Sequence, residues 1–248
     1  MSKVPPPKRH PYDQWSPDAR ALDIVGDKWT LLIIRDLAAG PRRFVELQRV
    51  LPGISTEQLR SRLGRMVADG LLSRSRYREV PPRVDYELTP RARDLMPVLS
   101  ELARWGYRWA WSEPRSRERV DIGAIFRLAP GLVADVGATG EVLCRISDGS
   151  RDGQELCYTM RCTDRVCEVF ERNVGAPGAE ITGDTNAWVA LFSPNIRDAS
   201  GLKVTGNRQL AERMLQRLAP RDQANADAAA AAAADEAGQN TRSGLAVA

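Results

Sequence analysis

The sequence predicts an α+β fold in two parts, a helical N-terminal part and a C-terminal part richer in strands. Apolar residues recur with helical spacing as far as about residue 111, whereas strand-like segments dominate from about residue 140. Residues 1–120 contain 23 Lys and Arg against 15 Asp and Glu, and residues 121–248 contain 13 against 17. Because a length of 248 residues also suits two domains, we expect two domains with different tasks.

The N-terminal part begins with three predicted helices. Apolar residues recur at helical spacing over Pro17–Val25, Lys28–Ala38 and residues 44–51. The second segment is apolar on almost every side, so we expect it in the middle of its domain. Gly40-Pro41 follows it and predicts its end, because proline cannot continue a helix.

A fourth helix is predicted to begin at about Thr56. It follows a tight turn at Pro52-Gly53, and Ser55 and Gln58 have the spacing of a capping box. Apolar side chains occupy one face of this helix, and polar side chains occupy the other. An ordinary surface helix would share this pattern, but a helix, a short turn and a second helix with a polar outer face is typical of helix-turn-helix DNA-binding proteins.

A basic hairpin follows the fourth helix. Residues 71–77 and 83–88 read as strands joined by a proline-containing tip, and residues 42–83 contain 10 Arg against 4 acidic residues. Such a hairpin is typical of a wing that places arginines on the DNA backbone or in the minor groove. The side chains predicted to contact double-stranded DNA are Ser55, Thr56, Gln58, Arg60, Ser61, Arg62, Arg65, Arg76, Arg78 and Arg83.

A long helix from Pro90 to Trp111 is predicted next, with Thr89 as its cap. It ends in three tryptophans and a tyrosine within seven residues, more than so small a domain buries alone. An intramolecular partner is one explanation, and a homodimer interface is the one we favour, because winged modules lengthen their site by two-fold pairing. The predicted dimer residues are Leu99, Leu102, Trp105 and Trp109.

Several motifs follow one another in order along residues 17–111, namely Ala21–Thr30, Gly40–Phe44 with Glu46-Leu47, Leu51–Ser55, Leu63 with Gly70-Leu71, and Pro81–Thr89. With these motifs, this part resembles the HxlR-type winged-helix transcriptional regulators. The resemblance implies homodimers that bind operator DNA. Many members carry a redox-sensing cysteine before the first helix, where this chain has Ser16, so thiol sensing by that route is excluded.

The C-terminal part reads as strands followed by helices. Residues 142–146, 156–162 and 166–170 predict a three-stranded antiparallel meander, with turns at Asp148-Gly149 and at residues 163–165. A strand at 179–184 leads into a helix at 185–191, and a strand at 202–206 leads into an amphipathic helix at 208–218.

This order of elements, with Ile-Thr-Gly-Asp at residues 181–184 and Gly201–Asn207 before the last helix, resembles the sterol-carrier-protein-like lipid-binding domain. The resemblance covers about residues 121–219 and implies an apolar cavity that takes a hydrophobic small-molecule effector. A filled core used for dimerisation or docking is the alternative. The predicted pocket residues are Tyr158, Phe170, Trp188, Leu191, Leu210 and Met214.

The predicted domain boundaries follow from these segments. We expect a flexible basic and proline-rich arm at 1–16, the winged helix-turn-helix domain at 17–112, a linker at 113–120, the sterol-carrier-like domain at 121–220 and a disordered alanine-rich tail at 221–248.

The composition argues against catalytic and metal-binding classes. His10 is the single histidine, and the four cysteines form no Cys-x-x-Cys pair, so we expect no metal, no cofactor and no histidine-based catalysis. The cysteines are expected to be buried thiols in a reducing cell. They are Cys144, Cys157, Cys162 and Cys167.

The pattern as a whole predicts a DNA-binding regulator rather than an enzyme, because no P-loop, dinucleotide or Gly-x-Ser-x-Gly fingerprint is present. Since no signal peptide or apolar run of about 18 residues appears, we expect a cytoplasmic, nucleoid-associated protein without membrane contact. The alternative is a lipid carrier with an accessory winged-helix domain.

Overall fold

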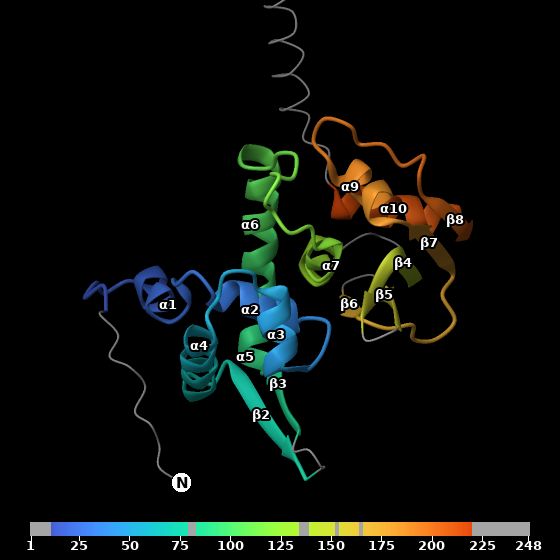
Figure 1. The fold of residues 1–248 in the computed structure, drawn as a ribbon. Helices are drawn as coiled ribbons and strands as arrows, with labels where there is room; N and C mark the ends of the chain where they lie inside the picture. The colour runs from blue at the N-terminus through green and yellow to red at the C-terminus, as the bar shows by residue number, and fades with distance from the viewer. Residues whose placement is uncertain (1–10, 79–82, 134–138, 152–153, 164–165, 220–248) are drawn as a thin grey trace, which may run out of the picture.

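The computed structural model describes residues 11–78, 83–133, 139–151, 154–163 and 166–219. Figure 1 shows two halves side by side, which we call the N-terminal half (α1 to α6) and the C-terminal half (α7 to α10). One hydrophobic core extends from Val25 to Leu99 and a second from Ile122 to Leu218. The predicted arm up to residue 10, the tip of the hairpin at 79–82 and the predicted tail lie outside the described residues.

The helices of the N-terminal half begin where the sequence places helix caps. Ser16 caps α1, Ser55 caps α4, and Thr89 caps α5. Helix α2 has Ile33 and Ile34 fully buried, as predicted for the central helix. The helices are α1 (Pro17–Val25), α2 (Thr30–Leu37), α3 (Phe44–Val50), α4 (Thr56–Ala68), α5 (Pro90–Arg93) and α6 (Met96–Trp109).

The predicted hairpin is confirmed and carries a third short strand. Strand β2 (Leu72–Tyr77) pairs antiparallel with β3 (Arg83–Leu88), and β1 (Arg42–Arg43) pairs with the other edge of β3. The sheet order is therefore β1-β3-β2. The two long strands extend away from the helices, at the bottom of Figure 1.

The predicted single helix from Pro90 to Trp111 is wrong, because the chain breaks it between Arg93 and Met96. Pro97 has no N–H to donate to the carbonyl four residues earlier, so a new helix starts with this proline in its first turn. Trp111 lies beyond the end of α6, and its indole N–H donates a hydrogen bond of 2.7 Å to the Phe192 carbonyl in the C-terminal half.

The C-terminal half contains a five-stranded sheet of order β6-β5-β4-β7-β8. Pairing is antiparallel except between β4 and β7, which are parallel. The predicted meander, the two later strands and both later helices are confirmed in type and order. The elements are α7 (Ile122–Phe126), α8 (Ala129–Leu132), β4 (Gly140–Arg151), β5 (Gln154–Cys162), β6 (Cys167–Phe170), β7 (Ala179–Gly183), α9 (Thr185–Phe192), β8 (Lys203–Gly206) and α10 (Arg208–Leu218).

The turn predicted at Asp148-Gly149 is wrong, because β4 continues through it to Arg151. The register shifts between Ile146 and Ser150, so the extra residues bulge from the ladder instead of reversing the chain. The Asp148 carboxylate accepts hydrogen bonds from the Thr185 backbone N–H (2.7 Å) and hydroxyl (2.9 Å) at the start of α9. These hydrogen bonds tie the bulge to the helix.

The expectation of four free thiols is wrong for one pair. Cys162 and Cys167 face each other in the pairing of β5 with β6 and form a disulfide. Cys144 and Cys157 are free and buried, and burial raises the pKa of each thiol. Within the described ranges, no helix is both long enough and apolar enough to cross a membrane.

Candidate nucleic-acid interface

Helix α4 is fixed at its start by the predicted capping box. The Gln58 backbone N–H donates to the Ser55 hydroxyl and the Ser55 backbone N–H donates to the Gln58 side-chain carbonyl, both at 3.1 Å. Thr56 is held from α3, because the Gln48 amide donates to its hydroxyl at 2.7 Å. Leu59 and Leu63 are fully buried on the inner face. The helix therefore has one fixed orientation relative to α3.

The outer face of α4 presents short polar and basic side chains to solvent. Gln58, Arg60 and Ser61 are exposed, as are the helix-start residues Ser55 and Thr56. Arg60 pairs with Glu57 at 2.9 Å, but both side chains are exposed, and such pairs contribute little to stability. Arg60 can therefore exchange this partner for a phosphate or a guanine edge.

Two of the predicted DNA-contacting arginines are less accessible. Arg62 is half-buried, and its guanidinium lies 2.9 Å from the Asp27 carboxylate, which also accepts the Trp29 and Thr30 backbone N–H groups at the start of α2. Arg62 thus joins α4 to α2. Arg65 is also half-buried, toward the end of α4.

The hairpin β2–β3 carries the remaining predicted contacts. Arg76 and Arg78 are exposed at its far end. Arg83 is held on β3, where it lies 2.6 Å from Asp85 and 5.4 Å from the centre of the Tyr77 ring. A ribbon with exposed arginines beside a helix with a polar outer face can contact phosphates and base edges together.

The predicted dimer residues fall on two sides of α6. Trp105 is 58% exposed and Trp109 is 64% exposed, and Val98 and Leu102 share their face. Leu99 is instead buried in the core of the N-terminal half. Apolar strips of this kind on a protein surface are typical of interaction sites.

The predicted pocket residues lie in and around the second core. Tyr158, Trp188, Leu210 and Met214 are buried there. Phe170 and Leu191 are half-buried. The Trp188 indole N–H donates to the Arg145 carbonyl at 2.9 Å, so its polar group has a partner within the core.

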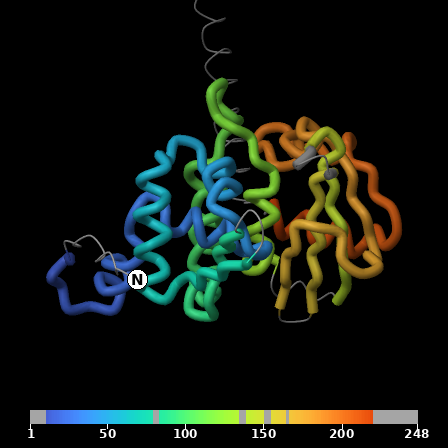
Figure 2. The backbone as a smooth tube through the Cα atoms, turned by 60° about the horizontal axis from the view of Figure 1, so that its bottom comes forward, coloured from blue at the N-terminus to red at the C-terminus, as the bar shows by residue number. Residues whose placement is uncertain are grey.

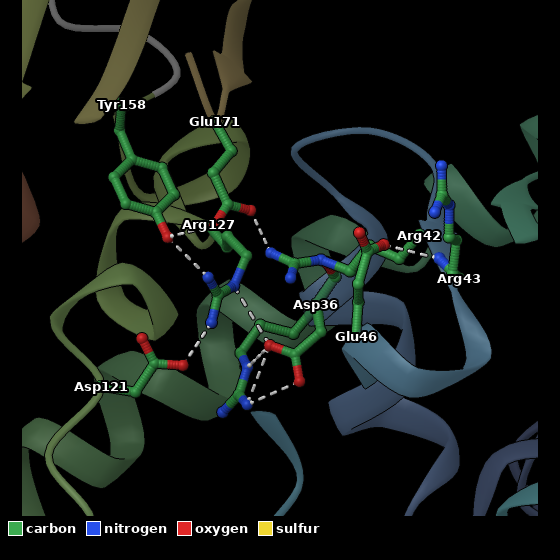
Figure 3. A network of polar contacts seen from close by, with 9 residues as sticks. Asp36, Arg42, Arg43, Glu46, Asp121, Arg127, Tyr158 and Glu171 are labelled. Carbon is green, nitrogen blue, oxygen red and sulfur yellow. Dashed lines mark hydrogen bonds and ion pairs between the residues drawn. The ribbon is translucent and has the colours of Figure 1, made fainter. Parts of the chain in front are cut away.

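A buried polar network joins the two halves, and Figure 3 shows it from close by. The Arg127 guanidinium lies 3.1 Å from the Asp36 carboxylate of α2 and 2.5 Å from Asp121. It also donates to the Tyr158 hydroxyl at 2.8 Å. Arg127 is 1% exposed and Asp36 is fully buried, so water does not screen this pair.

A second link runs in parallel. Arg42 of β1 pairs with Glu171, whose carboxylate also accepts the Tyr158 hydroxyl at 3.1 Å. Since β1 pairs with β3, this link connects the C-terminal half to the three-stranded sheet β1-β3-β2. We call Asp36, Arg42, Asp121, Arg127, Tyr158 and Glu171 the interdomain network.

Arg127 and Asp121 keep their charges within the network. Burial disfavours the charge on Arg127, but Tyr158, Asp36, Asp121 and Glu171 outweigh it and raise the pKa of Arg127 above its ordinary value. Burial alone would raise the pKa of Asp121, and Arg127 overrides this and lowers it. The pair is therefore ionised at neutral pH.

Sequence reasoning missed this network, because Asp36 and Arg127 are 91 positions apart. The only available signal was the residue type, since Asp36 and Arg127 are each a charged residue within an apolar helical segment. Such residues are rarely buried without a partner.

Comparison with known proteins adds to this geometry. The model of the HxlR-like helix-turn-helix family matches residues 24–114. An HTH-type transcriptional regulator of Synechocystis is 39% identical over 97 residues, which cover 39% of this chain and 72% of the relative. A second HTH-type transcriptional regulator, from Halalkalibacterium halodurans, is 43% identical over 96 residues, which cover 38% of this chain and 85% of the relative. Among solved structures, the reduced form of the transcriptional regulator YodB from B. subtilis is 31% identical in sequence. The match covers 39% of this chain and 96% of the YodB chain, with a TM-score of 0.35.

Proposed function

Because the chain belongs to the HxlR-like helix-turn-helix family of transcriptional regulators, we propose that it binds operator DNA as a homodimer, with α4 in the major groove and the β2–β3 hairpin as the wing. One observation carries this proposal: two elements that can contact DNA lie next to each other. The capped helix α4 exposes Gln58, Arg60 and Ser61, and the adjacent β2–β3 hairpin exposes Arg76 and Arg78. We propose that it acts in the cytoplasm, at the nucleoid.

The homodimer is proposed from α6. Leu102, Trp105 and Trp109 form an exposed strip that no other element of the described chain covers. Figures 1 and 2 also show α1 projecting from the body of the N-terminal half, where a second copy could pack against it. A two-fold dimer predicts half-sites about one helical turn apart, roughly 10 base pairs from centre to centre.

We propose that the C-terminal half is a sterol-carrier-like domain whose occupancy by a hydrophobic small molecule modulates DNA binding. Its mixed sheet under α9 and α10 has the order of elements that the resemblance implies. The lipid-carrier alternative is not favoured, because the relatives named above are transcriptional regulators.

The test is selection of a duplex from a random library by the full chain, followed by binding measurements on the selected sequence and on a scrambled one. We expect a two-fold symmetric site. Arg60→Ala should weaken binding to the selected site by about 1–3 kcal/mol if it meets a base edge, with a smaller effect on the scrambled duplex.

Arg208→Ala is the matched control, because Arg208 is an exposed arginine on a helix of the other half. Selection of no sequence, or equal effects of the two substitutions, would contradict the proposal.

A further inference from the structure

A cavity of about 730 Å³ lies between the two halves. Its lining comes from α2 and the two residues before it, the end of α3 and the turn that follows, α6, α7 and α9, together with residues 111–121, which connect the halves. This volume is within the range that holds a drug-sized molecule, and the walls are mainly apolar. None of the six predicted pocket residues of the C-terminal half lines it. The cavity is therefore a separate site from the one that sequence reasoning predicted.

Four aromatic side chains from both halves line the cavity, namely Trp29, Tyr107, Trp111 and Phe192. The rings of Tyr107 and Trp111 meet edge to face at 5.3 Å between their centres. The Tyr107 hydroxyl has no hydrogen-bond partner among the residues that the structure describes, and burial raises the pKa of Tyr107. The hydroxyl is thus a neutral donor that a ligand can use.

The lining carries more positive than negative charge, with five basic and two acidic residues. Both acids are already paired, Asp121 with Arg127 and Glu118 with Arg115. Neither is available to balance the cavity's other cations.

Arg35 is paired with Asp36, and Arg115 with Glu118, so three of the five cations remain. They are Lys28, Arg117 and Arg119. Within the described ranges none of the three forms an ion pair with a carboxylate. The Lys28 ammonium lies 5.0 Å from the centre of the Trp29 ring, and Arg119 donates to the backbone carbonyl of Arg49, which is neutral. All three are exposed at the edge of the cavity.

We propose that this interdomain cavity binds an amphipathic organic anion, an aromatic body with one carboxylate. The body packs against Trp29, Trp111 and Phe192, and the carboxylate meets Lys28, Arg117 and Arg119. A carboxylate at the edge gains the attraction of three cations, which a neutral ligand does not, and a polyanion would place charge against the apolar walls.

The cavity also connects to the DNA-binding helix, and this coupling rests on the proposed function. Trp29 donates its backbone N–H to Asp27 at 2.9 Å, and the same carboxylate lies 2.9 Å from Arg62 of α4. A ligand that displaces Trp29 therefore acts on α4 through one side chain. Coupling of this kind typically changes affinity by about 5-fold or more.

The first experiment is calorimetric titration of the full chain with naphthoate and with its neutral counterpart, naphthalenemethanol. We expect saturable binding of naphthoate and weaker binding of the alcohol. Lys28→Gln with Arg117→Gln should weaken naphthoate binding by about 3- to 10-fold and leave the alcohol unchanged, since both are exposed charges of modest individual strength.

A cavity-filling variant tests the location. A Cβ at Gly106 of α6 meets no atom within 4 Å, so Gly106→Leu extends into open space at the cavity wall. We expect at least about 10-fold weaker naphthoate binding. Gly64→Ala is the control for ligand binding, because Gly64 is also a mid-helix glycine with open space at its Cβ but lies outside the cavity.

The outcomes separate this site from the proposed function. Absence of saturable naphthoate binding, equal binding of acid and alcohol, or unchanged binding by Gly106→Leu would overturn the site. A selected duplex whose affinity is unchanged by bound naphthoate would overturn the coupling. Naphthoate binding by a protein that binds no duplex would support the site and contradict the proposed function instead.

Discussion

Replacement of Arg127 by alanine probes a buried contact between the two halves. The substitution removes one partner of the fully buried Asp36, and it removes a partner of Asp121 and of the Tyr158 hydroxyl as well. Breaking a buried ion pair from one side typically costs about 3–5 kcal/mol. Arg35 still contacts Asp36 at 3.0 Å, so Asp36 keeps one cation and the lower end of that range applies. We expect the free energy of unfolding to fall by about 3 kcal/mol.

Urea unfolding followed by circular dichroism measures this loss, with Arg208→Ala as the control. Arg208 and Glu212 form an exposed pair on α10, and loss of such a pair costs about 0.3–0.5 kcal/mol. Arg127→Ala should also make the segment at 111–121 more susceptible to proteolysis, because the halves separate more readily. An unfolding free energy for Arg127→Ala within about 0.5 kcal/mol of that for Arg208→Ala would refute the reasoning.

Three further predictions follow from single positions. Trp105→Ala should lower the mass observed by light scattering, because the exposed strip on α6 loses a large apolar side chain, and an unchanged dimer mass or a monomeric wild type would contradict it. Gly123→Ala should destabilise the protein by about 1–3 kcal/mol in thermal unfolding, since its Cβ would lie 2.0 Å from the Tyr158 hydroxyl, whereas Gly64→Ala should be neutral or stabilising. Arg127 outweighs burial and holds the folded pKa of Asp121 below its unfolded value of 3.8, so its stabilisation is complete above that value and is lost as the pH falls through the folded pKa. Asp121→Asn should flatten this part of the acid-unfolding curve, and an unaltered curve would contradict it.

Local signals in the sequence predicted most of the fold. The capping box at Ser55 and Gln58, the proline and glycine stops and the alternation in the strands each act within a few residues, so one sequence suffices to read them. The errors arose where another interaction outweighed the local sequence pattern. Pro97 started a new helix where the apolar spacing continued, and Asp148-Gly149 stayed within a strand, where the Asp148 carboxylate accepts hydrogen bonds from Thr185 of α9.

The candidate site was predicted in part for the same reason. Exposure of Gln58, Arg60 and Ser61 follows from helical periodicity alone. The pairing of Arg62 with Asp27 and the cavity beside Trp29 depend on how helices pack, which one sequence does not reveal. The interdomain network needs the packing of the two halves as well, so neither Asp36 nor Arg127 was recognised.

The most direct test of the central claim is the salt dependence of duplex binding, measured by fluorescence anisotropy on the selected sequence. If α4 and the wing contact DNA, the logarithm of the binding constant falls linearly with the logarithm of salt concentration. Arg76→Ala with Arg78→Ala should reduce the slope by about 1 for each phosphate that an arginine no longer neutralises, while the preferred sequence stays the same. A wild-type slope near zero, or a slope that the double substitution leaves unchanged, would contradict the account.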